Sequence, residues 1–218
     1  KIKALLISNG FKPDERRQHR FKHLTVPVDI VPFGGIESDK RKITWPPKLV
    51  SVMNLMGFEE TYKASREHSF RSKKVRVATV EGVAVLKVVA WEDRKNQSEK
   101  DAEDLEYILT NYAKLGFLAD ADLYKTHINL LTETYQGDAD LTRAELLGTR
   151  MADIAGPKVS DFLAAVIKRE ITDEHQLLIY HMSKTRDEYR TSRVSTILRA
   201  MLAGISKTKS NSGSPSKT

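Results

Sequence analysis

The stretch Lys74–Arg94, KVRVATVEGVAVLKVVAWEDR, changes its hydrophobic period partway along its length. Basic and apolar residues alternate as far as Val80, which is typical of a half-buried strand. Beyond that point the period is that of a helix, and Lys87 and Arg94 share one helical face, with Trp91 between them. We therefore expect strands before this stretch and helices after it.

The region before this stretch contains two short strand-like runs, His19–His23 and Leu24–Phe33. So few residues separate them that only a hairpin turn can connect them. Pro27 has no backbone N–H to donate, so its strand either begins there or lies at the edge of a sheet. The sequence thus predicts a small antiparallel or mixed sheet in this part of the chain.

The region after this stretch is predicted to be helical. Ser98 and Asp101 have the S-x-x-D spacing of a capping box, which predicts the start of a second helix that extends to Tyr112. Beyond Gly116 we expect only helical segments, at about 120–135, 140–155, 157–169, 173–186 and 190–204. The last residues, 206–218, have no apolar side chain except a proline ring and are predicted to be disordered.

These patterns predict an α+β fold in three parts. Residues 1–115 combine the small sheet with helices, residues 116–205 form an all-helical domain, and residues 206–218 form a tail.

Composition and charge exclude several classes of protein. The 218 residues include no cysteine, which rules out disulfide scaffolds and thiolate metal sites and favours the cytoplasm. No apolar stretch approaches the roughly 18 residues of a membrane span, so we expect no membrane partner. The first 100 residues hold 21 Lys and Arg against 12 Asp and Glu, whereas the other 118 hold 15 against 17. This asymmetry indicates either a polyanionic partner, such as nucleotide phosphates or nucleic acid, or a solvated basic surface.

Asp29 is a carboxylate inside the otherwise apolar run Val28–Phe33. An unpaired charge in the interior of a sheet is costly or shifts its pKa. The side chain must therefore meet a cation, a metal ion or the open end of a cleft, and a salt bridge to a nearby arginine is the simplest of these. The next residues, Gly34 and Gly35, would let a ligand or another backbone approach closely.

Lys87 lies among apolar residues that would bury its stem and leave its ammonium group at the helix surface. It could extend to water, or it could bind phosphate, a role that suits a compact charge on a flexible stem. Arg94 lies two turns further along the same face, so the two cations could bind one anion. We expect Trp91 in the core rather than as a platform for a base.

Asp101 and Asp104 lie three residues apart on the second helix. Both could reach Lys87 or Arg94 if the two helices pack as an antiparallel pair. Capping alone would explain Asp101, whereas Asp104 lies deeper in its helix. The histidine spacing indicates no zinc site.

Five stretches resemble the AbiEii/AbiGii-type nucleotidyltransferase family of abortive-infection and toxin–antitoxin systems, in order and spacing as well as in residues. They are VDIVPFGGI (28–36), TWPP (44–47), VATVEGVAVLKVVAWEDR (77–94), KDAEDLEYILTNY (100–112) and AELLGTRMADIAG (144–156). The resemblance extends to about residue 205. It implies that residues 1–115 form a partial nucleotidyltransferase-like domain of the DNA polymerase beta superfamily.

This resemblance implies a toxin that moves a nucleotide from a nucleoside triphosphate to a hydroxyl group of an RNA, such as transfer RNA, or of a protein. It also implies a cognate antitoxin and two Mg²⁺ or Mn²⁺ ions held by three carboxylates. Asp29 would be a metal ligand and would receive the proton of the attacking hydroxyl group. The glycine pair Gly34-Gly35 would lie against the substrate.

The family's K-x6-R helix matches Lys87 and Arg94, which would neutralise the triphosphate. Its D-x-x-D pattern matches Asp101 and Asp104, and Asp104 would orient one or both cations. We therefore expect Asp29, Lys87 and Arg94 to face one cleft, with Asp101 or Asp104 at its wall.

The family's upstream motif, a glycine-serine followed by D-x-D, does not precede Asp29 in this sequence. One aspartate cannot hold two metal ions, so we expect either a longer native chain or a relative that has lost catalysis. We expect the 218 residues on their own to bind a nucleoside triphosphate weakly and to transfer nothing. The alternative is a non-catalytic module that keeps the fold and binds nucleic acid or a partner protein.

Overall fold

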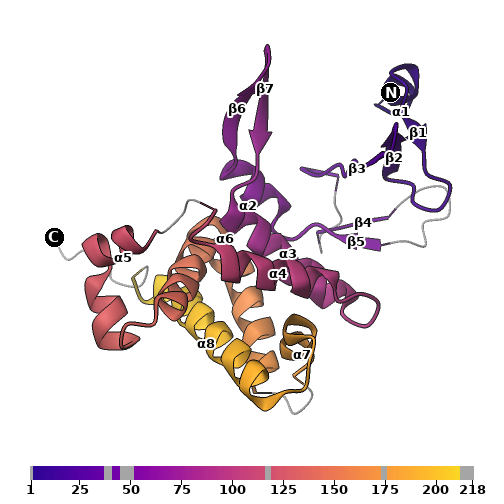
Figure 1. Cartoon of the computed structure of the whole chain (residues 1–218). Coiled ribbons are helices and arrows are strands. Elements are labelled where there is room, and N and C mark those ends of the chain that lie inside the picture. The colour runs from indigo at the N-terminus through magenta and orange to yellow at the C-terminus, as the bar shows by residue number, and fades with distance from the viewer. Residues whose placement is uncertain (1, 37–40, 45–51, 116–118, 173–175, 212–218) are drawn as a thin grey trace. The chain divides into compact units, whose positions relative to one another are not determined.

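The chain forms two compact units that divide between Glu59 and Glu60. The computed structural model describes residues 2–36, 41–44, 52–115, 119–172 and 176–211 (Figure 1). The TWPP stretch at 44–47 lies mostly outside these residues.

The first unit contains a short helix and two small antiparallel sheets. Helix α1 (Ile2–Ser8) is followed by a sheet in the order β1 (Lys12–Pro13), β2 (Arg20–His23) and β3 (Val26–Asp29). Strands β4 (Lys42–Thr44) and β5 (Val52–Asn54) form the second sheet. The predicted hairpin is confirmed in β2 and β3, and β3 is an edge strand, which accommodates Pro27.

An exposed hairpin lies near the beginning of the second unit, which starts within α2. After α2 (Phe58–Lys63), β6 (Arg66–Phe70) and β7 (Lys73–Val77) pair antiparallel, and all ten strand residues are exposed. The prediction of a half-buried strand is therefore wrong for β7. Alternation of basic and apolar residues shows which side chains lie on the same face of a strand. That face is buried only if another layer of the protein covers it. In the described part of the chain the hairpin projects away from the helices that follow it (Figure 1).

Two helices, α3 (Val80–Arg94) and α4 (Lys100–Asn111), follow the hairpin and confirm the change of period. The hydroxyl group of Thr79 accepts a hydrogen bond from the backbone N–H of Gly82 at 3.2 Å and thereby caps α3. Trp91 is fully buried, as expected for a core residue.

Further helices complete the second unit: α5 (Asp120–Thr126), the π-helix η1 (Leu130–Thr134), α6 (Ala139–Glu170), α7 (Leu177–Ser183) and α8 (Glu188–Asn211). The predicted break of α6 is confirmed at Gly156, which has a φ of 67° and precedes Pro157. Gly148 of α6 and Gly204 of α8 lie where the two helices pack closely, and neither position has room for a Cβ atom. Helix α8 extends to Asn211, so the prediction of disorder is wrong for residues 206–211, and residues 212–218 lie outside the described part.

The mixed α+β composition and the helical C-terminal region are confirmed, but the described strands form three separate antiparallel sheets rather than one. A boundary was expected after residue 115. In the structure α3 packs on α6, and α4 packs on α7, so helices on both sides of that position belong to one unit. The reason is that burial of the apolar residues of α3 and α4 requires the later helices.

Candidate functional site

Two cations of α3 meet two carboxylates of α4, as the spacing predicts for an antiparallel helix pair. The ammonium group of Lys87 donates to Asp104 at 2.5 Å and to Asp101 at 3.3 Å. The guanidinium group of Arg94 donates to the second carboxylate oxygen of Asp101 at 2.6 Å. We call Lys87, Arg94, Asp101 and Asp104 the α3–α4 charge cluster.

Asp101 is the centre of this cluster. Its side chain is 4% exposed and bridges both cations, with one carboxylate oxygen for each. The capping-box interpretation of Asp101 is therefore wrong, since its carboxylate is used by α3. At the start of α4 the hydroxyl group of Ser98 instead accepts a hydrogen bond from the backbone N–H of Lys100. A buried carboxylate with two cationic donors is a fixed anchor for both of them.

The other three members of the cluster remain accessible to solvent. The side chain of Lys87 is 27% exposed, that of Asp104 40% and that of Arg94 53%. An incoming anion could therefore replace Asp104 at Lys87 while Asp101 stays in place. The chemistry available here is the binding of a multiply charged anion by two cations of fixed spacing.

A second polar group that the sequence did not reveal lies at the N-terminal end of α3. The hydroxyl group of Tyr112 donates to Glu81 at 2.6 Å, and the guanidinium group of Arg150 donates to Tyr112 at 3.2 Å. Burial, together with the hydrogen bond to Glu81, raises the pKa of Tyr112 above its usual range. The partners of Glu81 are distant in the sequence, so no local pattern identifies this group.

A third polar group links the C-terminal half of α3 to α6. The guanidinium group of Arg169 donates to both carboxylate oxygens of Glu92, at 2.6 and 3.1 Å, and to Glu170 at 2.7 Å. Burial opposes ionisation of Glu92, but the hydrogen bonds from Arg169 and Lys95 outweigh it and lower the pKa of Glu92. These contacts fix the orientation of α3 and therefore of the cations it carries.

Trp91 has a structural role between Lys87 and Arg94. Its indole N–H donates to Nδ1 of His181 on α7 at 3.2 Å, which holds α3 against that helix. Nε2 of the same imidazole lies 3.8 Å from the carboxylate of Glu99. Because Trp91 is buried, it offers no face to a nucleotide base.

Asp29, the proposed metal ligand, forms a two-point salt bridge with Arg20. Nε and Nη2 of Arg20 each donate to one carboxylate oxygen, both at 2.7 Å, across the β2–β3 pair. The hydrogen bonds from Arg20 lower the pKa of Asp29, and burial opposes them only in part. The simplest of the expected arrangements for Asp29, a salt bridge to a nearby arginine, is thus confirmed.

The described residues do not fit a two-metal site. Both oxygens of Asp29 are bound by Arg20, and no three side chains of His, Cys, Asp or Glu in the described ranges gather as metal ligands. A cleft shared by Asp29 and Lys87 would join the two units, and it stays a prediction. Gly34 and Gly35 have φ angles of 87° and 84°, and a Cβ atom at either would meet nothing within 4 Å. They therefore require glycine for their backbone conformation.

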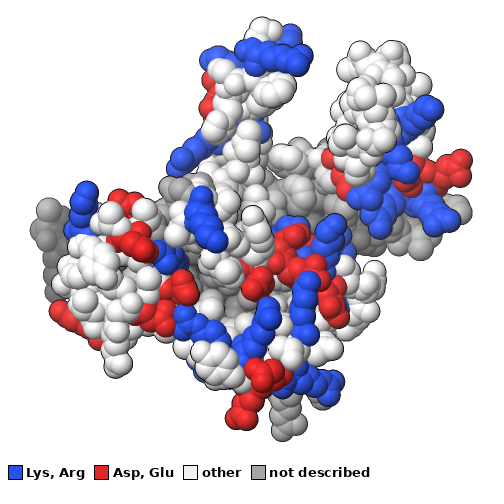
Figure 2. All heavy atoms as spheres, viewed as in Figure 1, with Lys and Arg blue, Asp and Glu red and all other residues white. Residues whose placement is uncertain are grey.

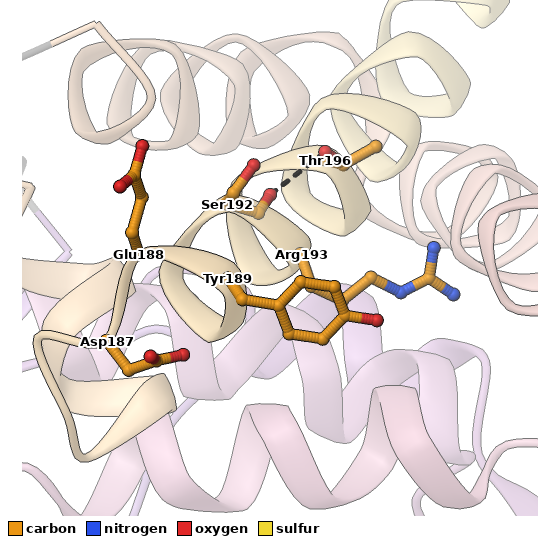
Figure 3. Close-up of a pocket in the computed structure, with 6 residues that line it drawn as sticks. All are labelled: Asp187, Glu188, Tyr189, Ser192, Arg193 and Thr196. Carbon is orange, nitrogen blue, oxygen red and sulfur yellow. Dashed lines mark hydrogen bonds between the residues drawn. The ribbon is translucent and has the colours of Figure 1, made fainter.

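The described cavities lie elsewhere, at the beginning of α8. An open hollow lies beside Tyr189 and Arg193, whose side chains extend along the same side of the helix (Figure 3). A neighbouring cavity of about 280 Å³ extends between α8 and α4, where Leu109 and Val194 contribute to its walls. Arg193 is held by Asp138 at 2.6 and 3.0 Å. None of the residues expected from the sequence to form the site lines these cavities.

Comparisons with protein-family models, curated proteins and solved structures found no match to this chain. Among the helices of the described ranges, none is both long enough and apolar enough to cross a membrane.

Proposed function

We propose that the α3–α4 charge cluster binds the triphosphate of a nucleotide, in a chain related to the nucleotidyltransferases that modify an RNA or protein hydroxyl group. The observation that carries this proposal is the contact of Lys87 and Arg94 with Asp101 and Asp104. The K-x6-R and D-x-x-D patterns of the sequence contain these same four residues.

The arrangement of charges supports binding rather than a purely structural role. Asp101 alone contacts both Lys87 and Arg94, so neither cation is left without a carboxylate when Asp104 is displaced. Asp104 therefore acts as an exchangeable partner, which phosphate oxygens can replace at Lys87. Phosphates bind more strongly than a single carboxylate because they offer more acceptor oxygens and more negative charge.

The proposal for these residues is limited to holding the triphosphate. Transfer to an acceptor requires further metal-binding carboxylates, and Asp29 is engaged by Arg20. This same salt bridge favours the second candidate, a non-catalytic module that keeps the fold and binds nucleic acid or a partner protein. The toxin role and the cognate antitoxin belong to the first candidate.

The test is a titration of the full 218-residue chain with each of the four nucleoside triphosphates, with and without Mg²⁺. We expect weak, saturable binding that Lys87→Met reduces by at least about tenfold, since Met keeps the apolar stem and removes the charge. Asp104→Asn should preserve binding or strengthen it, because it leaves Lys87 more available.

A matched control is Lys158→Met, an exposed lysine on α6. The control should bind as the wild type does, and thermal unfolding should confirm that all variants are folded. Equal affinity of Lys87→Met and the wild type would contradict the proposal. We expect the 218 residues on their own to incorporate no labelled nucleotide into RNA. Incorporation that Asp29→Asn abolishes would favour the enzyme over the non-catalytic module.

A further inference from the structure

The β6–β7 hairpin is the most exposed element of the second unit. All ten residues of its strands are exposed, and the two strands pair only with each other. An isolated two-stranded hairpin gains little stability from its own contacts. An element that contributes so little to the core has a surface available for a partner.

The surface of the hairpin is basic. Residues 66–77 include five Lys and Arg but only one acidic residue, Glu67. Lys74 forms an ion pair with Glu67 at 2.8 Å, and Arg76 donates to Ser65. In the described part of the chain, no carboxylate neutralises the other three cations, which are Arg66, Arg71 and Lys73. Figure 2 shows blue side chains at the tip and near the base of this projection.

Two exposed aromatic rings accompany these cations. Phe70, at the end of β6, is 67% exposed, and the guanidinium group of Arg71 lies 5.9 Å from the centre of its ring. Tyr62, at the base of the hairpin, is 50% exposed, and the guanidinium group of Arg76 lies 5.0 Å from the centre of its ring. The ring of Phe70 can stack on an unpaired base while Arg71 remains close to the backbone of the same strand. Tyr62 lies against Arg76, whose side chain is on the other face of the hairpin.

The register places apolar and basic side chains on one face of the hairpin. Phe70 pairs with Lys73, and Arg66 pairs with Val77, so these four side chains lie on the same side of the ribbon. A face with an aromatic ring among basic residues has the composition that single-stranded nucleic acids require. In a duplex the bases are stacked on one another, so no unpaired base is available to stack on the ring of Phe70.

We propose that the β6–β7 hairpin binds single-stranded RNA. Arg66, Arg71 and Lys73 contact the phosphates, and the ring of Phe70 stacks on a base. The choice of RNA rests on the proposed function, in which an RNA hydroxyl group is an acceptor. The hairpin leads directly into α3, and Lys87 lies two helical turns, or about 10 Å, beyond the first residue of that helix.

The test measures binding of the full chain to a short labelled single-stranded RNA by fluorescence anisotropy, without triphosphate and over a series of salt concentrations. The triple variant Arg66→Ala, Arg71→Ala and Lys73→Ala should lose affinity and lower the slope of log affinity against log salt by about two. A matched control is Lys125→Ala, Lys158→Ala and Lys168→Ala, which removes the same charge from exposed helical positions. We expect this control to bind RNA with an affinity close to that of the wild type.

A second pair of variants tests stacking independently of charge. Phe70→Ala should weaken RNA binding by about tenfold, and Phe70→Tyr should restore it, because tyrosine keeps the ring. Equal binding by both triple variants would overturn the proposal. So would tighter binding of a single-stranded DNA of the same sequence, of duplex RNA, or of anionic phosphatidylserine vesicles than of the RNA strand.

The two proposals fail separately. If the hairpin variants lose affinity for RNA but still bind triphosphate, the hairpin is the RNA-binding surface, whatever the α3–α4 charge cluster binds. If Lys87→Met leaves triphosphate binding unchanged while the hairpin variants lose RNA, the proposed triphosphate site is wrong and the RNA surface remains. If the hairpin variants keep RNA, the hairpin assignment is wrong.

Discussion

The α6–α8 helix pair and the β6–β7 hairpin of the second unit differ sharply in packing. A Cβ atom at Gly148 would lie 2.0 Å from the backbone oxygen of Met201, and one at Gly204 would lie 1.9 Å from that of Glu145. In the hairpin, by contrast, even Val75 and Val77 are 44% and 47% exposed. Stability is therefore concentrated in the helices, so the hairpin can carry a binding surface without being needed for the fold.

The largest expected effect comes from breaking the contact between α6 and α8. Gly148→Ala places a methyl group where the backbone of α8 lies, so the helices must separate. We expect a loss of about 3 kcal/mol or more in the free energy of unfolding, measured by urea denaturation. Asp153→Ala, at an exposed position of the same helix, should change it by less than about 0.5 kcal/mol. Wild-type stability of Gly148→Ala would show that the helices are not in close contact.

The α3–α4 charge cluster should give an intermediate effect. Asp101→Asn removes the buried charge that holds Lys87 and Arg94, and we expect it to cost about 2 kcal/mol, since both cations can still reach water. Asp104 is 40% exposed, so Asp104→Asn should cost less than about 1 kcal/mol. Thermal unfolding of both variants checks the order, and equal losses would contradict the anchoring role of Asp101.

A smaller, pH-dependent effect is expected at the beginning of α6. Hydrogen bonds from Arg193 lower the pKa of Asp138. This pair therefore stabilises the protein above the unfolded pKa of about 3.9, and the contribution is lost as the pH falls through the lowered folded value. Asp138→Asn should cost about 1 kcal/mol at neutral pH, because asparagine still caps α6 but lacks the charge.

The measurement is urea denaturation of the wild type and Asp138→Asn over a pH series. The difference between them should shrink in acid, once Asp138 of the wild type is protonated. A difference that stays constant over the whole series would rule out the ion pair as its cause.

The smallest effect should come from the hairpin itself. Phe70→Ala removes a ring that is 67% exposed, so the free energy of unfolding should change by less than about 0.5 kcal/mol. The same variant is expected to weaken RNA binding, so the two measurements together separate stability from binding. A large loss of stability would show that the hairpin packs on another part of the chain.

Local sequence patterns predicted most of the helices and their breaks, but the segment expected as one helix at about 120–135 is divided into α5 and η1. The predicted helix that begins near Val80 and includes Arg94 is observed as α3, and the break at Gly156-Pro157 is confirmed. Both are local properties: hydrophobic period and the backbone preferences of glycine and proline act within a few residues. The length of α8 was underestimated. Beyond residue 205 the helix forms an ion pair between Lys207 and Glu145, and a contact between residues so far apart leaves no local pattern in the sequence.

The candidate site was predicted in part. The spacing of seven in α3 and of three in α4 placed the four charged residues on facing surfaces, and the structure confirms that they meet. The burial of Asp101 was not predicted, since a capping box explains the same residue equally well. The contacts of Glu81 with Tyr112 and Arg150 join residues far apart in the sequence, and no local pattern reports such pairs.

Local patterns in the amino-acid sequence are enough to locate most of the helices, the glycine and proline residues that end them, and the charges of α3 that share a face. The burial of Asp101 between Lys87 and Arg94, and the exposure of both faces of the alternating strand before α3, follow only from the packing of distant segments. The physical reason is that period and backbone preference depend on neighbouring residues, whereas burial depends on what another part of the chain places on the surface.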